Sequence, residues 1–328
     1  MRFNRFQKIA FTSVGITLFL IFLGGLVRVS GSGLGCPDWP RCFGMWVPPT
    51  SAAQLPAGFD AGQFNVYKTW TEYINRLFGV LTGLSILLTF TVSSAYRKKA
   101  PSVFYSSGIA LLLVAFQAWL GGMVVRSELM GWLVTGHLLI AIIIVNLLLY
   151  AAFRANPHIL PVKLDGTLKK HLFTAGMVVL GITLLQMVLG TQLREAVDMV
   201  KAQQPELPRE DWLGATGMLD YVHRSFSLIV LAAGSALLYF TFREIKRTGA
   251  TLIKIAGTIL GLIIFQMVLG LGMAYIGMPP SYQVLHLLTS AVLVCAESYF
   301  LMAVRVKRPA RKNEEKNKKA GPYVTGPA

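Results

Sequence analysis

Two five-residue stretches of this chain carry the residues with the clearest potential for chemistry, and they are nearly the same. EYINR covers residues 72–76 and DYVHR covers residues 220–224. Each stretch has an acid, then a tyrosine, and an arginine four residues after the acid. The position before the arginine is Asn75 in the first stretch and His223 in the second. An imidazole binds transition metals well and an amide binds them poorly, so the two copies differ at the position where a metal would bind.

The duplication extends beyond these two stretches. A shift of 148 or 149 residues aligns Asn75 with His223, His137 with His286, and FQAWLG at 116–121 with FQMVLG at 265–270. The sequence QMVLG occurs once more, at 186–190. Repeats of this length indicate a fold that is built from two similar halves.

Long apolar segments must position these residues. Hydrophobic residues make up 54% of the 328 residues and charged residues 14%, whereas soluble domains have about 25% charged residues. A helix of roughly 20 apolar residues spans a bilayer. The first segment is too long, and lacks the cleavage site, for a removable signal peptide. We expect eight spans, at about 9–28, 73–95, 104–126, 131–153, 172–194, 218–242, 252–275 and 283–304.

The charge distribution orients these spans. The net charge is +16, and 22 of the 31 Lys and Arg residues fall in alternate segments that contain only four acids. This pattern places those segments, and both termini, in the cytoplasm. We therefore interpret the basic charge as a solvated cytoplasmic anchor, or as a surface for anionic lipids, and not as a site for nucleic acid. The basic segments are 2–8, 97–99, 154–170, 243–254 and 305–319.

Each half contains four spans, an even number, so both halves insert in the same orientation. We predict an all-α membrane protein whose eight transmembrane helices form two four-helix bundles related by a pseudo-twofold axis. The predicted units are an N-terminal bundle at 1–155, a cytoplasmic linker at 156–171, a C-terminal bundle at 172–304 and a basic tail at 305–328.

Three histidines, His137, His223 and His286, lie within spans that run inward, at one depth near the outer face. Polar residues inside a membrane are costly and are usually functional. Two histidines that face each other across a bundle can serve as axial ligands of a haem iron, and we predict this role for His223 and His286. A hydrogen bond between helices is the alternative. A zinc site needs three or four close ligands, which neither half of the sequence provides.

Five arginines lie at the outer ends of spans, on the side where positive charge is normally scarce. A guanidinium group binds carboxylates in a bidentate manner, so haem propionates are the predicted partners. Contact with lipid phosphate is the alternative. The five are Arg28, Arg76, Arg126, Arg194 and Arg224.

Two of the three cysteines, Cys36 and Cys42, lie in the outer loop GSGLGCPDWPRCFG. On the outer face of a bacterial membrane, such a pair can form a disulfide. Two free thiols are the alternative.

The sequence resembles the bacterial haem A synthase family over about residues 10–304. The resemblance rests on GGLVRVSGSGLGCPDW after the first span, on the acid–x–x–His–Arg pattern in even-numbered spans, and on the tandem four-span repeat. It implies an enzyme that oxidises the C8 methyl group of haem O, by successive hydroxylations, to the formyl group of haem A. It also implies that the N-terminal bundle holds the substrate haem and that the C-terminal bundle holds a haem b that passes electrons.

The resemblance assigns roles residue by residue. Glu72 matches the glutamate proposed to act in the oxidation, although an acid at a helix start that pairs with Arg76 is the alternative. His137 matches the histidine of the substrate haem, and His223 and His286 match the haem b pair. The family pattern expects a histidine where this chain has Asn75. The substrate haem would then be held through His137, with an open or weak ligand position at Asn75.

The resemblance further implies a bacterial cytoplasmic (inner) membrane location and a role in assembling a terminal cytochrome oxidase. Its expected partners are the farnesyltransferase that makes haem O and a quinol or another membrane electron donor. Two other functions stay open, a di-haem electron carrier that takes electrons from quinol and a haem-binding assembly factor without turnover. Glu297 lies about 16 Å inward of His286 at 1.5 Å per residue. A hydrogen bond between helices is its preferred role.

Overall fold

The computed structural model describes residues 3–156, 164, 166–244 and 250–305. Within these residues, eight helices are long and apolar enough to cross a membrane, which confirms the prediction of an all-α, multi-pass membrane protein. Short 3₁₀ turns and an isolated bridge between Cys42 and Met45 are the other regular structure in the described part. The helices are α1 (Arg5–Val29), α2 (Val66–Ser93), α3 (Pro101–Arg126), α4 (Gly131–Arg154), α5 (Gly166–Gln203), α6 (Met218–Glu244), α7 (Ala250–Tyr275) and α8 (Pro280–Arg305).

Local sequence signals set several helix starts. The side chain of Asn4 accepts a hydrogen bond from the backbone N–H of Gln7, and the side chain of Gln7 accepts one from the N–H of Asn4. This reciprocal capping satisfies donors that the first turn of α1 leaves free. Helices α3 and α8 begin at Pro101 and Pro280, where the fixed φ of proline suits a first helical residue.

Two helices extend beyond the spans predicted from hydropathy. Helix α2 begins at Val66, not near residue 73, because Asn65 caps it by accepting from the N–H of Lys68. Helix α5 continues to Gln203, past the predicted end at residue 194. In the added turns, Val197 packs in a small apolar cluster with Leu213 and Met278. This packing stabilises the helix beyond the point where the sequence becomes less hydrophobic.

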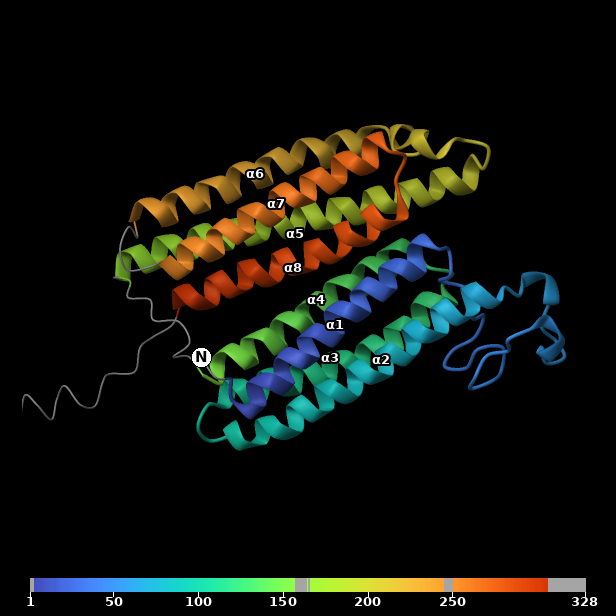
Figure 1. The fold of residues 1–328 in the computed structure, drawn as a ribbon, viewed down its shortest axis with the longest axis horizontal. Helices are drawn as coiled ribbons and strands as arrows, with labels where there is room; N and C mark the ends of the chain where they lie inside the picture. The colour runs from blue at the N-terminus through green and yellow to red at the C-terminus, as the bar shows by residue number, and fades with distance from the viewer. Residues whose placement is uncertain (1–2, 157–163, 165, 245–249, 306–328) are drawn as a thin grey trace, which may run out of the picture.

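The helices pack as two groups of four (Figure 1). Helix α1 packs against α2 and α4, and α3 also contacts both of these helices. Helix α5 packs against α6 and α8, and α7 also contacts both. The first and last described residues lie at the same end of the molecule, opposite the long loop between α1 and α2.

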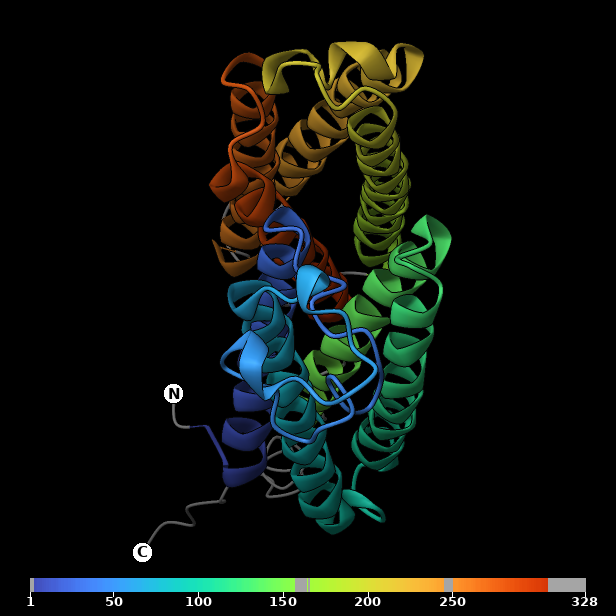
Figure 2. The same ribbon diagram turned by 90° about the vertical axis from the view of Figure 1, so that its right-hand side faces the viewer.

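The two groups meet mainly through α8, which packs against both α1 and α4, while α4 also contacts α5. A buried apolar cluster fills this junction, and its members come from all four helices: Ile21, Ile142, Val145, Met187, Ala291 and Val294. Figure 2 shows the same division, with the outer loop lying across the end of the α1–α4 group.

The repeat is visible in burial as well as in sequence. A shift of 148 residues superimposes the buried positions of α2 on those of α6, and a shift of 166 does the same for the outer parts of α1 and α5. The pseudo-twofold axis itself stays a prediction. The predicted linker lies partly outside the described residues, and residues 166–171 already form the first turns of α5. The predicted tail after Arg305 lies outside them.

Candidate functional site

The two histidines of the α5–α8 group lie on helices that share both of their neighbours. His223 lies on α6 and His286 on α8, and each of these helices packs against both α5 and α7. The Nδ1 atoms of both rings are buried, and neither has a hydrogen-bond partner among the described residues. Two buried imidazoles from two helices of one bundle form a donor set that suits a haem iron.

Glycines on the neighbouring helices make room for these rings. A Cβ atom added at Gly190 of α5 would lie 3.0 Å from Cε1 of His223, and one added at Gly270 of α7 would lie 3.8 Å from Cε1 of His286. The imidazoles therefore lie directly against the backbones of α5 and α7.

His137 on α4 has a similar setting in the α1–α4 group. A Cβ atom at Gly121 of α3 would lie 3.6 Å from Cε1 of His137, and Nδ1 of His137 is buried without a partner among the described residues. Asn75 on α2 completes the set of four repeat-related positions. Its Oδ1 atom is also buried and unpartnered in the described part of the chain.

Sequence reasoning missed a set of glutamines that hold the histidine-bearing helices. The side-chain amide of Gln117 donates to the backbone oxygen of His137 at 2.8 Å. Gln186 makes the same contact with His223 at 3.0 Å, and Gln266 makes it with His286 at 2.8 Å. The recurring FQ-x-x-LG and LQ-x-x-LG sequences were the available signal.

Glu72 is buried, with an exposed fraction of 4%, and both of its carboxylate oxygens are engaged. Oε1 accepts a hydrogen bond from Nη2 of Arg76 at 2.5 Å, and Oε2 accepts one from the backbone N–H of Cys36 at 2.8 Å. Arg76 also donates to the backbone oxygens of Asp38 and Arg41, each at 2.8 Å. The acid and the arginine of the EYINR stretch thus hold the outer loop on α2.

This loop is closed by a disulfide between Cys36 and Cys42, as predicted. Gly35 lies so close to the backbone of α2 that a side chain there would overlap Lys68, and Thr69 donates to the oxygen of Gly35 at 2.8 Å. The ring of Trp39 packs on Gly122 of α3, next to the glycine that contacts His137. The loop therefore lies over the outer end of the α1–α4 group, near His137.

The counterpart of Glu72 in the second half has no such loop. Asp220 is buried and forms an ion pair with Arg224. The shared acid and arginine therefore form an ion pair within the helix in both halves. Among the described residues, only the first pair also binds backbone groups of a loop.

The other arginines predicted to bind propionates differ in their contacts. Arg28 on α1 and Arg194 on α5 both pair with Asp198, at 3.1 Å and 2.9 Å, so the ion pair joins the two groups of helices at their outer end. Arg194 also donates to Gln283 on α8 at 2.5 Å. The side chain of Arg126 makes no hydrogen bond or ion pair with the described residues. Propionate binding by the five arginines stays a prediction.

Two features of the deeper interior lie away from the histidines. Glu297 on α8 accepts a hydrogen bond from Thr183 on α5 at 2.7 Å, the helix-to-helix contact that was preferred from the sequence.

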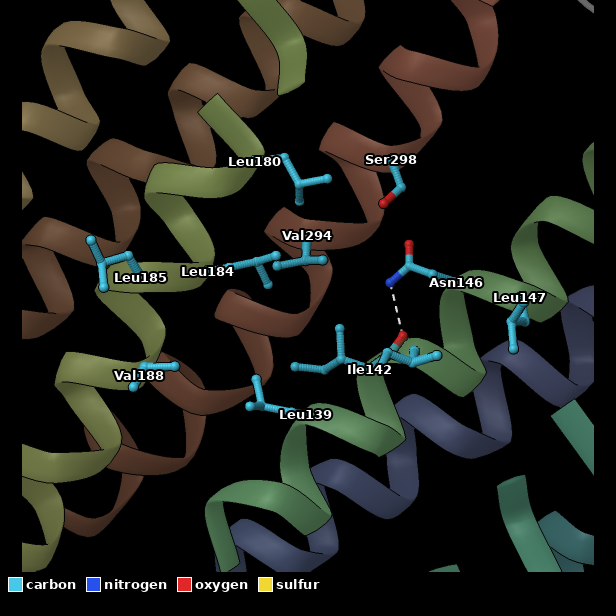
Figure 3. Close-up of a pocket in the computed structure, with 11 residues that line it drawn as sticks. Leu139, Ile142, Asn146, Leu147, Leu180, Leu184, Leu185, Val188, Val294 and Ser298 are labelled. Atoms are coloured by element: carbon cyan, nitrogen blue, oxygen red, sulfur yellow. Dashed lines mark hydrogen bonds between the residues drawn. The ribbon is translucent and has the colours of Figure 1, made fainter. Parts of the chain in front are cut away.

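A groove of about 570 Å³ lies between α4, α5 and α8 (Figure 3). Its lining is apolar apart from Asn146 and Ser298, as expected for a surface that faces lipid chains.

The COX15-CtaA family model, described as cytochrome oxidase assembly protein, matches residues 7–297 of the chain. The chain belongs to this family. The match includes the site residues described above and most of every helix, and it confirms the resemblance that was drawn from the sequence.

Several relatives of this chain carry the name haem A synthase. The one from Shewanella oneidensis is 25% identical over 299 residues, which cover 82% of this chain and 88% of the relative. The one from Wolbachia pipientis is 23% identical over 325 residues, which cover 88% and 90%. The one from Ehrlichia canis is 30% identical over 157 residues, which cover 42% and 45%.

Proposed function

We propose that the protein is a haem A synthase of the bacterial cytoplasmic membrane that oxidises the C8 methyl group of haem O to a formyl group. The observation that carries the proposal is the pair His223 and His286, with buried and unpartnered Nδ1 atoms, in a chain whose family is that of cytochrome oxidase assembly proteins. Relatives named haem A synthase support the same activity.

In this proposal the second half binds a resident haem b through His223 and His286. When bound, haem b would pass electrons one at a time from the membrane donor to the first half, where dioxygen would be the oxidant of the methyl group. Gly190 and Gly270 keep the two imidazoles against the neighbouring helices, so the residues present fit a bis-histidine haem. Arg224 and Arg194 lie in the same half and are the proposed propionate partners.

The first half binds the substrate, haem O, through His137. Asn75, at the position that repeats His223, provides at most a weak ligand, so one axial face of the substrate iron stays accessible. Arg28, Arg76 and Arg126 are the proposed propionate partners in this half. The loop closed by Cys36 and Cys42 excludes water from the outer end of the site.

Glu72 is the proposed catalytic residue. It precedes Asn75 by three residues, so both lie on one face of α2. Its carboxylate would stabilise positive charge on the reacting methyl carbon, or accept a proton from incoming water. Because its oxygens also hold Cys36 and Arg76, a test must separate its role in the loop from its role in the reaction.

The proposal is tested by extracting and chromatographing the haems of the purified protein after expression with a source of haem O, which in the cell is the farnesyltransferase. Haem A together with haem B is the expected result. Haem B with unconverted haem O would contradict the proposal and support a di-haem electron carrier fed by quinol. Bound haem without either conversion or reduction by quinol would support an assembly factor.

A further inference from the structure

Three of the four repeat-related helix pairs share one contact. On α3, α5 and α7, a glutamine amide donates to the backbone oxygen of the histidine on the following helix of the pair, at 2.8–3.0 Å. This oxygen lies within a helix, so the bond fixes both the height and the rotation of the histidine-bearing helix relative to its neighbour.

The same three helices carry a glycine four residues after the glutamine, at Gly121, Gly190 and Gly270. In each case the histidine ring is the side chain within contact distance of the glycine, with Cε1 at 3.0–3.8 Å from an added Cβ atom. The glutamine therefore holds the histidine backbone while the glycine receives its ring. We call this glutamine, glycine and histidine the Gln–Gly–His unit.

The fourth pair, α1 with α2, lacks both polar members of the unit. Arg28 and Gly24 of α1 correspond to Arg194 and Gly190 of α5 in spacing and in burial. The residue four before the glycine is then Leu20, where α5 has Gln186. No side chain lies within 4 Å of a Cβ atom added at Gly24. The partner position on α2 is Asn75, so the glutamine and the histidine are replaced together.

We infer that Gln117, Gln186 and Gln266 are positioning residues that aim the histidines at their haems, and that α1 and α2 form a fourth unit from which positioning and ligand groups are both missing. The inference rests on the proposed function for the identity of the ligand. The inference goes beyond the proposed function in one consequence. A histidine introduced at position 75 would lack the glutamine hydrogen bond that holds the other three histidine backbones. Restoring a ligand on this face requires Leu20→Gln together with Asn75→His.

The first experiment measures low-spin haem per folded chain in full-length Asn75→His, Leu20→Gln and the double variant, loaded with haem. The double variant is expected to gain a second low-spin haem, and this gain is expected to disappear when His137→Ala is added. Each single variant is expected to gain much less. A full gain with Asn75→His alone would overturn the inference, as would a double variant that gains nothing.

The converse experiment uses the second half. Gln186→Leu reproduces the residue found in α1, and Gln192→Leu makes the same chemical change at an exposed position of α5. The readout is carbon monoxide binding to the reduced, folded protein, because a haem with two firmly placed histidines has no free axial position. A first-half haem with an open face at Asn75 binds carbon monoxide in every variant, so the readout is the amount bound beyond that of the wild type. Gln186→Leu is expected to bind more carbon monoxide than the wild type and to lose low-spin intensity, whereas Gln192→Leu is expected to match the wild type.

The two experiments separate the inference from the proposed function. A wild-type protein without low-spin haem would overturn both. A wild-type protein with low-spin haem that is unchanged in Gln186→Leu would overturn only the positioning role. If Gln186→Leu lowers the yield of folded protein but leaves the spectrum per folded chain unchanged, the glutamine hydrogen bond is purely structural. That result would also overturn the positioning role.

Discussion

At the scale of single residues, Glu72 combines a proposed chemical role with a visible structural one. We expect Glu72→Gln to keep haem O bound and to lose most of its conversion to haem A, because a neutral amide cannot stabilise developing positive charge. Side-by-side haem extraction from the variant and the wild type measures this. Asp220→Asn, at the repeat-related position, is the matched control and is expected to leave conversion near the wild-type rate.

A second control separates the reaction from the loop. Thr69→Val removes the hydrogen bond to the oxygen of Gly35 and loosens the loop while leaving Glu72 intact. If this variant loses as much conversion as Glu72→Gln, the carboxylate acts by holding the loop and its catalytic assignment is wrong. Conversion at the wild-type rate in Glu72→Gln would also refute that assignment.

The glycines against the histidine rings give another prediction. In Gly190→Ala, the new Cβ atom would lie 3.0 Å from Cε1 of His223, so the ring must move. We expect a weakened low-spin spectrum and a destabilisation of about 1–3 kcal/mol from overpacking. Gly24→Ala is the matched control, since nothing lies within 4 Å of its Cβ position, and it is expected to stabilise α1 by up to about 1 kcal/mol.

Thermal unfolding measures the stability of both glycine variants, and the absorption spectrum of the reduced protein measures their low-spin haem. Equal spectra for Gly190→Ala and the wild type would show that His223 does not depend on its contact with α5.

The sequence was sufficient to select the three intramembrane histidines and Asn75, because repetition marks positions that share a role. It did not reveal what the glutamines do, since a repeated glutamine does not show which atom it binds. The contacts of Glu72 also could not be predicted from the sequence, because they depend on how an irregular loop folds back on α2.

At the scale of elements, the loop between α1 and α2 is held at several independent points. Removing the disulfide with Cys36→Ser and Cys42→Ser costs about 2 kcal/mol of loop stability in the chain-entropy model. The bonds from Thr69 and Arg76 to the loop backbone remain. We therefore expect the loop to stay in place but to open more often.

Limited proteolysis of the loop in detergent-purified protein checks this, with faster cleavage expected in the double variant and unchanged cleavage elsewhere. Haem binding in the second half provides the control, since the loop lies across the end of the α1–α4 group. Cleavage at the wild-type rate would show that the backbone bonds alone determine the position of the loop.

Helix boundaries show the limits of sequence reasoning for elements. Hydropathy located all eight spans, because each must match the thickness of the bilayer. It placed the start of α2 late and the end of α5 early, since capping by Asn65 and packing of Val197 act outside the apolar core. These boundaries matter for how the two groups are joined, because Asp198 on the extended part of α5 pairs with Arg28 of α1 and Arg194 of α5.

At the scale of the whole molecule, the sequence predicted two similar halves but not how they meet. Hydropathy is nearly uniform around α1, which lies at the junction, so it does not show which face of this helix meets another helix and which meets lipid. The structure places α8 at the centre of the junction, where it packs against helices of the first group as well as its own.

This junction gives a prediction about two segments, 1–155, which is the predicted N-terminal bundle, and 156–328, which combines the predicted linker, C-terminal bundle and tail. Within a membrane, helices associate through close packing rather than through the hydrophobic effect, and Ala291 on α8 is 1% exposed within the buried cluster of the junction. We expect the two segments, expressed as separate chains, to copurify, and Ala291→Leu to reduce copurification because the larger side chain has no room. Ala236→Leu, the same change at an exposed position of α6 in the same half, is the matched control and is expected to copurify as the wild type does. Failure of the wild-type segments to associate, or equal recovery with Ala291→Leu, would show that the covalent connection rather than the α8 junction holds the halves together.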